Sequence, residues 1–404
     1  MKAHWEMKKL GEVCGLTRGP FGGSLKKAIF KKDGYAVYEQ SHAIYNQFNN
    51  VRYFIDTDKF KEMNRFELNS GDLIMSCSGT MGKVAIVPRN IKRGIINQAL
   101  LRLAPTKKIS NVFLKLWMES ENFQESLKAY SQGAAIQNVA SVKILKEIQM
   151  PVPSIPEQKH IVAILDEAFA AIATAKENSK KNLQNSRELF ESYLQSVFAN
   201  PGDGWEEKKL QEIGVTQTGT TPKTSDKKNY GDFIPFVKPA DVDISGNGEI
   251  RYSNEGLSEQ GLKNGRKMSK GSILMVCIGA TIGKVGFVDR DVSCNQQINS
   301  LTVNKDFHPK FFYYALSTQS FFEQVIINSA QATLPIINKG KWEILTVNYP
   351  KSLSEQRAIV SKLDALSAET KKLEALYQQK LNDLDELKKS VLQKAFNGEL
   401  TGTA

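Results

Sequence analysis

The feature that most constrains the fold of this chain is that the sequence repeats itself. The segment WEMKKLGEV at Trp5 returns as WEEKKLQEI at Trp205, and GDLIMSCSGTMGKV at Gly71 returns as GSILMVCIGATIGKV at Gly271. Further matches follow in the same order to the end of each copy. A period of this length predicts two similar modules rather than a solenoid of short repeats.

The two copies differ most at residues 20–70 and 220–270. Matched segments therefore surround unmatched inserts, which indicates one frame that recognises two different things. Within the matched segments, GDLIMS and GSILMV predict buried strands after a glycine turn, and KVAIVP and KVGFVD predict the strands that follow. Short helices are predicted at residues 120–130 and 317–326.

The composition is that of a globular protein, because 404 residues with 41% hydrophobic content can form two cores of ordinary domain size. No apolar run approaches the ~18 residues that a membrane span needs, and no N-terminal segment resembles a signal peptide. We therefore expect a cytoplasmic protein with no membrane association. The four cysteines form no CxxC pair, so no disulfide framework or zinc site is predicted, and Cys77 and Cys277 are expected to be buried thiols.

The net charge of +11 lies outside two nearly neutral segments, residues 156–199 and 354–397, which together hold 13 basic and 13 acidic side chains. Basic globular modules favour a polyanionic partner, most simply nucleic acid. A solvated basic surface without a partner is the alternative that charge alone leaves open.

Both neutral segments predict long helices, because neither contains proline after its first residues. Ser154 and Ser354 are expected to cap them. A 3-4 spacing in the second helix predicts a coiled-coil seam through Leu363, Leu366, Thr370, Leu373, Tyr377, Lys380, Leu384, Leu387 and Val391. The alternative for the first helix is a local bend that brings Leu183 into a seam otherwise predicted through Leu165, Ala168, Ile172, Ala175, Ser179, Asn182, Ser186, Leu189 and Tyr193.

Only residues 200–204 connect the first helix to the second module, so the two helices are expected to pair in antiparallel orientation. The predicted fold class is α+β: two tandem mixed α/β domains, two long helices that pair as an antiparallel coiled coil, and a pseudo-two-fold internal repeat. The predicted boundaries are 1–153 for the first domain, 154–199 for the central spacer helix, 200–204 for the linker, 205–350 for the second domain and 351–404 for the C-terminal spacer helix.

No catalytic or metal site is predicted. Glycine turns at Gly79–Lys83 and Gly279–Lys284 are similar to a nucleotide-binding P-loop, but their glycine spacing is wrong and valine follows the lysine. Each turn can still hold a DNA phosphate, or be a plain tight turn between strands. Asp203, Glu206 and Glu207 crowd together, so a solvated linker is expected there rather than a metal-dependent nuclease. The usual amino-methyltransferase motif is absent, and the four histidines show no ligand spacing.

With these features the chain resembles the specificity subunits of Type I restriction–modification systems. The resemblance covers essentially the whole chain: each module opens with a Trp-x-x-x-x-Leu segment and closes with a Pro-x-x-x-Glu-Gln entry into a long helix. Pro153, Glu157 and Gln158 match that entry, whereas Pro350 lies one residue further back in the second copy. The resemblance implies two target-recognition domains that each bind half of a bipartite double-stranded DNA sequence, with the helix pair setting the distance between the halves.

The resemblance also implies partner subunits. Two modification subunits would bind S-adenosylmethionine, methylate adenine and dock on the helix pair, and restriction subunits would use ATP for translocation and cleavage. This chain would be the reader, with no active site or cofactor of its own.

Residues that can read base edges or hold phosphates gather in the inserts and glycine turns. The predicted DNA contacts of the first module are Arg18, Lys26, Lys27, Gln40, His42, Thr80 and Lys83. Those of the second, which includes a GTTP stretch resembling a loop common in the family, are Thr220, Thr221, Lys223, Lys238, Asp241, Thr281 and Lys284. Some residues are shared by both modules and are expected to hold backbone or fold rather than specify sequence: Thr80, Lys83, Thr281, Lys284, Asn97, Gln98, Asn295 and Gln296.

Two other functions are alternatives at this point. A stand-alone nuclease or methyltransferase would show activity as the isolated chain. A coiled-coil scaffold that does not bind nucleic acid would show no binding to DNA that weakens at high salt.

Overall fold

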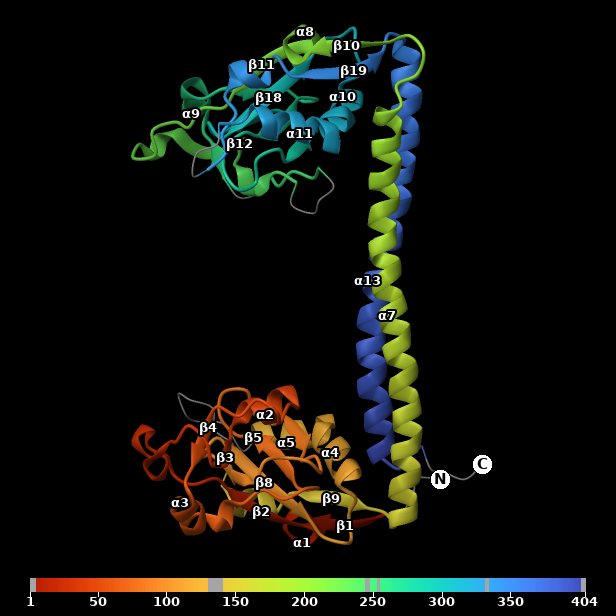
Figure 1. Ribbon diagram of the computed structural model, residues 1–404. Helices are drawn as coiled ribbons and strands as arrows, with labels where there is room; N and C mark the ends of the chain where they lie inside the picture. Colours follow the sequence, from red (N-terminus) through yellow and green to blue (C-terminus); the bar gives the residue numbers. More distant parts are fainter. Residues whose placement is uncertain (1–4, 130–140, 244–247, 253–254, 331–333, 401–404) are drawn as a thin grey trace. The chain divides into compact units, whose positions relative to one another are not determined.

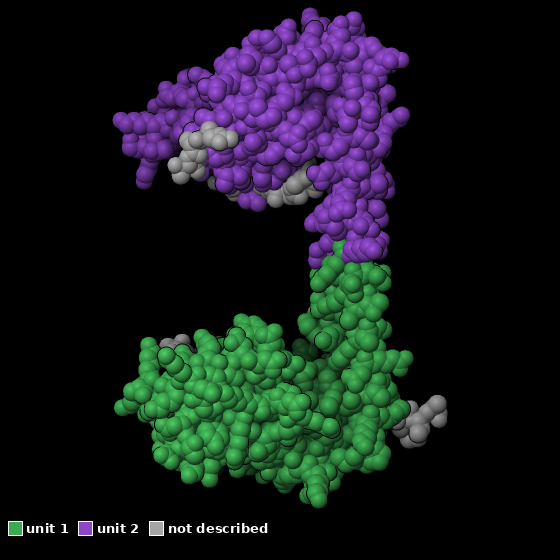
Figure 2. Space-filling view, viewed as in Figure 1, with its two compact units in different colours: residues 1–180, 379–404 green, residues 181–378 purple. Residues whose placement is uncertain are grey.

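The computed structural model describes residues 5–129, 141–243, 248–252, 255–330 and 334–400. The chain divides into two compact units, one formed by residues 1–180 with 379–404 and the other by residues 181–378 (Figures 1 and 2). Each unit holds one globular module and one stretch of each long helix. The boundary between the units therefore cuts across both helices.

Among the residues that the structure describes, the first module contains three small sheets. A four-stranded antiparallel sheet has the order β2-β8-β5-β6, β3 lies between antiparallel β4 and parallel β7, and β1 pairs with β9. The strands are β1 (Glu6–Lys9), β2 (Cys14–Arg18), β3 (Tyr35–Tyr38), β4 (Tyr53–Ile55), β5 (Leu73–Ser76), β6 (Val84–Ile86), β7 (Gly94–Ile96), β8 (Leu100–Pro105) and β9 (Gln149–Val152). The helices are α1 (Leu10–Val13), η1 (Gly22–Ser24), η2 (Lys27–Ile29), α2 (Gln40–Tyr45), α3 (Thr57–Glu62), η3 (Asn64–Phe66), α4 (Asn111–Glu119), α5 (Glu121–Ala129) and α6 (Val142–Lys146).

The second module repeats this plan. Its sheets have the orders β11-β18-β15-β16, β13-β12-β17-β14 with β12 parallel to β17, and β10-β19. The strands are β10 (Trp205–Lys209), β11 (Gly214–Thr218), β12 (Tyr230–Val237), β13 (Gly256–Leu257), β14 (Lys267–Met268), β15 (Ile273–Val276), β16 (Val285–Phe287), β17 (Val292–Cys294), β18 (Ile298–Val303) and β19 (Thr346–Pro350). The helices are α8 (Leu210–Ile213), η4 (Lys227–Asn229), η5 (Pro239–Asp241), α9 (Glu259–Asn264), α10 (Pro309–Leu316), α11 (Gln319–Asn328) and α12 (Lys339–Trp342).

The predicted strands of the matched segments are present because they are buried on both faces. In β5, Leu73 and Met75 enter a core formed with α4 and α5, whereas Ile74 enters a second core with Ala36 and Ile96. The corresponding strand β15 alternates in the same way between two cores. This explains why both strands read as continuous apolar runs rather than as alternating patterns.

The two long helices, α7 (Ile155–Ala199) and α13 (Leu353–Phe396), pair in antiparallel orientation as predicted. In the first unit Lys176 of α7 forms an ion pair with Asp385 of α13. In the second unit Arg187 binds Glu374 at 3.0 Å. Because the residue number rises along one helix as it falls along the other, the helix directions are opposite.

The opening tryptophan and the Glu-Gln pair join each module to its helix. Trp5 Nε1 donates to Glu157 Oε1 at 2.8 Å, and Trp205 Nε1 donates to Glu355 Oε1 at 3.0 Å. The glutamine that follows each glutamate, Gln158 or Gln356, is completely buried and hydrogen-bonds to the backbone of its own module. The repeated motif is therefore a docking device between helix and module.

One predicted helix cap is confirmed and the other is wrong. Ser154 Oγ accepts a hydrogen bond from the Glu157 N–H at 3.4 Å, as expected. In the second copy the equivalent acceptor is Ser352, which receives the Glu355 N–H at 3.4 Å, and Ser354 lies inside α13. Helix α13 begins at Leu353, one residue before the predicted cap, and Gln356 in its first turn accepts the His308 N–H at 2.8 Å.

The predicted seam needs correction in both helices. In α7 the seam continues from buried Ser179 through partly buried Leu183, as the alternative reading proposed, to buried Ser186 and Leu194. The exposed positions that the 3-4 spacing had placed in the seam are Asn182, Leu189 and Tyr193 in α7, and Leu373, Lys380 and Leu387 in α13. Where two four-residue steps follow one another, the buried face of the helix shifts relative to a continuous heptad pattern. This shift accounts for the difference between the predicted and the observed seam positions.

The four cysteines are buried as free thiols, and burial raises the pKa of each of them to about 12. Among the residues that the structure describes, no helix is both long enough and apolar enough to span a membrane.

Candidate nucleic-acid interface

Three separate segments of the first module meet at one tight turn. This turn, residues 97–99, follows β7 and is called the first strand-end turn. The Asn97 N–H donates to the Tyr38 carbonyl at the end of β3 at 2.9 Å, and the Gly19 N–H donates to the Leu100 carbonyl at 2.9 Å. Arg18 Nε donates to the Gln98 carbonyl at 3.2 Å. The ends of β2, β3 and β7 therefore converge there.

The second module builds the same arrangement at residues 295–297, the second strand-end turn. The Asn295 N–H donates to the carbonyl of Val237 at 3.2 Å, and the Gly219 N–H donates to that of Ile298 at 2.9 Å. The Thr220 N–H adds a hydrogen bond to the Cys294 carbonyl at 2.9 Å. Segments from the second insert therefore converge just as those of the first insert do.

A glycine is required where the segment after β2 or β11 passes the strand-end turn. A Cβ atom on Gly19 would lie 1.8 Å from the Asn97 carbonyl oxygen, and one on Gly219 would lie 2.2 Å from that of Asn295. Neither distance is compatible with any larger side chain. The shared glycine, Gly19 or Gly219, thus belongs to the frame.

The shared asparagines hold these turns, as expected of residues common to both modules. Asn97 Oδ1 accepts the Ala99 N–H at 3.0 Å, and Asn295 Oδ1 accepts the Gln297 N–H at 3.1 Å. The neighbouring Gln98 and Gln296 are exposed, and of their two side chains only that of Gln296 is bonded to a converging segment, through the Thr221 hydroxyl. The sequence comparison placed all four residues in one class because it detects sharing, not burial.

Two predicted DNA contacts, His42 and Asp241, occupy equivalent buried positions. His42 Nδ1 accepts the Glu39 N–H at 2.9 Å at the start of α2, and Asp241 Oδ2 accepts the Lys238 N–H at 3.0 Å at the start of η5. Each side chain therefore caps the short helix that follows β3 or β12. A contact of either residue with DNA stays a prediction.

The other predicted residues of the inserts differ in exposure. Gln40 is partly buried at the first position of α2, and its Oε1 is enclosed without a hydrogen-bond partner. Lys26, Lys27 and Lys223 are exposed, the first two around η2. Exposed Lys238 forms an ion pair with Glu255, which offsets its charge.

The two threonines of the GTTP stretch lie beside the second strand-end turn. Thr220 is held there through its backbone, and the Thr221 hydroxyl donates to Gln296 Oε1. The structure therefore brings Arg18, Thr220 and Thr221 to strand-end turns, whereas Gln40 lies at the start of α2 and Lys26 and Lys27 lie at η2.

The glycine turns begin at the same end of each four-stranded sheet. The Cys77 N–H donates to the Ala99 carbonyl at 2.9 Å, and the Cys277 N–H donates to that of Gln297 at 2.8 Å. Thr80, Lys83 and Thr281 are exposed on these turns. Gly79 and Gly82 have φ values of 62° and 75°, in the left-handed region that favours glycine.

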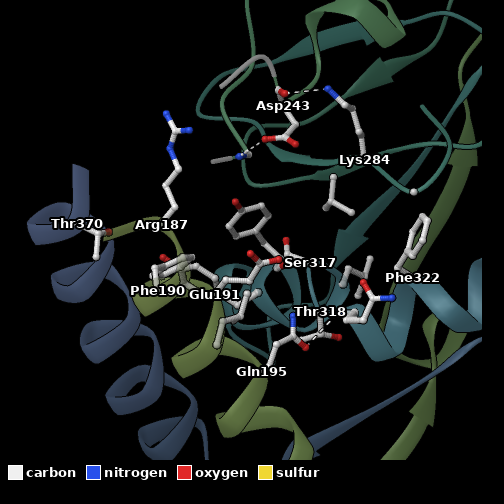
Figure 3. A pocket seen from close by; sticks show the side chains of 18 of the residues that line it. Arg187, Phe190, Glu191, Gln195, Asp243, Lys284, Ser317, Thr318, Phe322 and Thr370 are labelled. Carbon is white, nitrogen blue, oxygen red and sulfur yellow. Dashed lines mark hydrogen bonds between the residues drawn. The ribbon is translucent and has the colours of Figure 1, made fainter. Parts of the chain in front are cut away.

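The second glycine turn also borders a cavity of about 630 Å³ within the second unit (Figure 3). Lys284 Nζ donates to the Asp243 carbonyl at 3.1 Å at the wall of this cavity, so the lysine is partly committed to the fold. The opposite wall comes from α7 and α13, through Arg187, Phe190 and Thr370. A phosphate contact through either glycine turn stays a hypothesis.

The acidic residues after the first long helix do not form a metal site. Glu206 and Glu207 lie in β10 rather than in the solvated linker that was predicted, and the ion pair of Glu206 with Lys351 at 2.7 Å lowers the pKa of the Glu206 carboxyl. Over the residues described, no group of three or more possible metal ligands is present.

The chain matches the family described as Type I restriction modification DNA specificity domain twice, over residues 2–185 and 202–383. It belongs to this family. Each of the two matched domains contains one strand-end turn and one glycine turn. The two matched copies confirm the two-domain organisation that the sequence predicted.

Individual relatives support the assignment. The Type I restriction enzyme HindI specificity subunit of Haemophilus influenzae is 30% identical over 49% of this chain, and the match spans 42% of that relative, less than half its length. The putative MjaX specificity subunit of Methanocaldococcus jannaschii is 21% identical over 98% of this chain and 93% of that protein. A chain from a solved type I R-M system structure aligns over 99% of both chains with a TM-score of 0.77 and 19% identity, which shows the shared fold.

Proposed function

We propose that this chain is the DNA-reading subunit of a Type I restriction–modification complex, in which each module binds one half of a bipartite double-stranded target. The observation that carries the proposal is the pair of strand-end turns. Both are held by the same backbone hydrogen bonds, yet they present different insert residues. A shared backbone frame that presents two different sets of side chains is suited to reading two different half-sites.

The helix pair has the properties of a spacer. Each module is anchored to it through a tryptophan–glutamate hydrogen bond and a buried glutamine. Linking two weak half-site contacts through a stiff connection raises overall affinity through effective concentration. A fixed connection also fixes the separation of half-sites that can be bound together.

The chain is proposed to act without catalysis of its own. S-adenosylmethionine and ATP would bind in two modification subunits and in the restriction subunits. The outer faces of the helices are suited to docking, because they expose apolar side chains that the seam does not use, namely Leu189, Tyr193, Leu376 and Leu387.

The first test is methylation mapping by long-read sequencing of the host genome before and after deletion of this gene. The expected result is loss of adenine methylation at one asymmetric two-part motif. Restoring the gene with Lys26→Ala and Lys27→Ala should then alter only one half of that motif, because both lysines lie in the first module.

A matched variant, Lys159→Ala, replaces an exposed lysine of α7 and should leave the motif unchanged. Equal weakening of both halves by the Lys26 and Lys27 substitutions, or no change in either, would contradict the two-reader proposal. Binding of the purified complex to the identified duplex should weaken steeply with salt, whereas a DNA-independent scaffold would show no such binding.

A further inference from the structure

Each strand-end turn carries an exposed glutamine, Gln98 or Gln296, that projects from a hydrogen-bonded backbone. Gln98 follows the asparagine that holds the first turn, and only its backbone carbonyl is engaged, by Arg18. Within the described residues its side-chain amide makes no hydrogen bond and is exposed. Gln296 takes the same place on the second turn and is also exposed.

The support beneath these glutamines is rigid. The turn backbone is bonded on one side to the end of β3 or β12 and on the other to the converging glycine segment. The glycine contact leaves no room for a Cβ atom, so the segments cannot move closer together. A side chain that projects from such a support keeps its position when a ligand approaches, which is the condition for accurate readout.

The segment that follows each converging glycine differs between the modules. Gly19 and Gly219 are equivalent, because each donates to the residue that begins the neighbouring strand, Leu100 or Ile298. Two residues further along, the first module therefore has Phe21 where the second has Thr221.

Of these two side chains, only Thr221 can hydrogen-bond to a glutamine. The Thr221 hydroxyl donates to Gln296 Oε1, so one acceptor position of that amide is occupied and its orientation is set. Phe21 has no polar atom to offer and is 93% exposed. Within the described residues Gln98 consequently keeps both its side-chain carbonyl and its amino group free of hydrogen bonds.

We propose that Gln98 and Gln296 each read one base of their half-site, and that the residue at position 21 or 221 determines which base edge the glutamine accepts. This inference rests on the proposed function. A glutamine with both amide groups free can pair with N6 and N7 of adenine, and an adjoining apolar ring can contact the methyl group of thymine. A glutamine whose carbonyl is bound by threonine offers mainly its amino group, which suits an acceptor on the base edge.

The test uses the full chain co-expressed with the modification subunits of its own system and a plasmid library in which the bases of the recognised motif are randomised. Methylated sequences are read out by long-read sequencing. Gln98→Ala should reduce the preference at one base of the first half-site by about five- to hundred-fold and leave the second half unchanged. Gln296→Ala should do the same at one base of the second half.

Thr221→Val keeps the shape of the side chain and removes the hydroxyl, so it should alter the same base as Gln296→Ala. Gln184→Ala, an exposed glutamine of α7, is the matched control and should leave every base preference unchanged. Unchanged motifs in the Gln98 and Gln296 variants would overturn the inference. A change by Thr221→Val at a different base from Gln296→Ala would overturn the role of position 221.

If Gln98→Ala abolishes methylation, a second variant, Gln98→Met, distinguishes base reading from a role in the fold, because it keeps the side-chain length without the amide. A relaxed base position supports the inference, whereas the wild-type motif, or loss of all methylation with both variants, assigns Gln98 to the fold and overturns it. The proposed function fails separately, if the wild-type complex methylates no two-part motif at all.

Discussion

Gln158 offers the sharpest test of how a module is joined to its long helix. Its Oε1 accepts the Ser110 N–H at 2.8 Å, and its Nε2 donates to the Lys108 and Pro153 carbonyls at 3.0 and 2.9 Å. Gln158→Leu fills a similar volume but leaves three backbone groups without partners. At about 1 to 1.5 kcal/mol for each group, the substitution should destabilise the first unit by about 3 to 5 kcal/mol.

The equivalent substitution in the second unit provides a comparison for the size of this destabilisation. Gln356 accepts the His308 N–H and donates to the Pro350 carbonyl, at 2.8 and 2.9 Å, so Gln356→Leu leaves two groups unpaired. Its expected cost is about 2 to 3 kcal/mol. The two variants should therefore differ in size and act on different units.

Native-state hydrogen exchange measured by mass spectrometry suits this question, because a chain of two units need not unfold in one step. Peptides covering residues 106–120 should exchange about a hundred-fold faster or more in Gln158→Leu, while those covering 304–318 stay unchanged. Lys159→Ala, on the next exposed position, should change neither set. A loss below about 1 kcal/mol, or equal losses in both units, would refute the docking role of the glutamine.

Three further predictions follow from burial and close contact. Because burial raises the pKa of every thiol to about 12, a thiol reagent at pH 8 should leave the native protein largely unreacted and modify four cysteines after unfolding: Cys14, Cys77, Cys277 and Cys294. Burial lowers the pKa of His308 below its ordinary 6.5, so the unfolded state binds its proton first as pH falls, and denaturant titrations should show stability declining below about pH 6.5 more steeply than in His308→Gln. Gly19→Ala should destabilise the first module by about 1 to 3 kcal/mol, because its Cβ would meet the Asn97 carbonyl at 1.8 Å, whereas Gly15→Ala, whose nearest contact is 3.8 Å, should have little effect in the same exchange measurement.

The architecture was predictable because each element appears twice in the sequence. Strands β5 and β15 are short apolar runs bounded by Gly71 and Gly271, and both glycines have a φ of 85° that few other residues adopt. The long helices were predictable from the absence of proline. The start of α13 was not, because Ser352 and Ser354 are equally good caps in isolation and the tertiary contact of Gln356 decides between them.

The candidate interface was predictable only in parts. Sequence reasoning selected Arg18 and the GTTP threonines as separate candidates, and the turns at which they lie depend on the parallel pairing of β3 with β7 and of β12 with β17. Such pairings join residues that are far apart in sequence, and no local pattern specifies them. The burial of His42 and Asp241 also follows from this pairing, since each caps the turn at the end of the same strand.

The equivalence of His42 and Asp241 bears on how specificity is encoded. An imidazole nitrogen and a carboxylate oxygen perform the same task, which is to accept one backbone N–H at the start of a short helix. Much of the difference between the inserts is therefore exchange of one structural solution for another. Other residues have side chains that neither cap a helix nor bond the frame, and they include exposed Lys26, Lys27, Lys223 and Gln98. We therefore expect base discrimination to depend on this smaller set, and a change of specificity to require fewer substitutions than the divergence of residues 20–70 from 220–270 suggests.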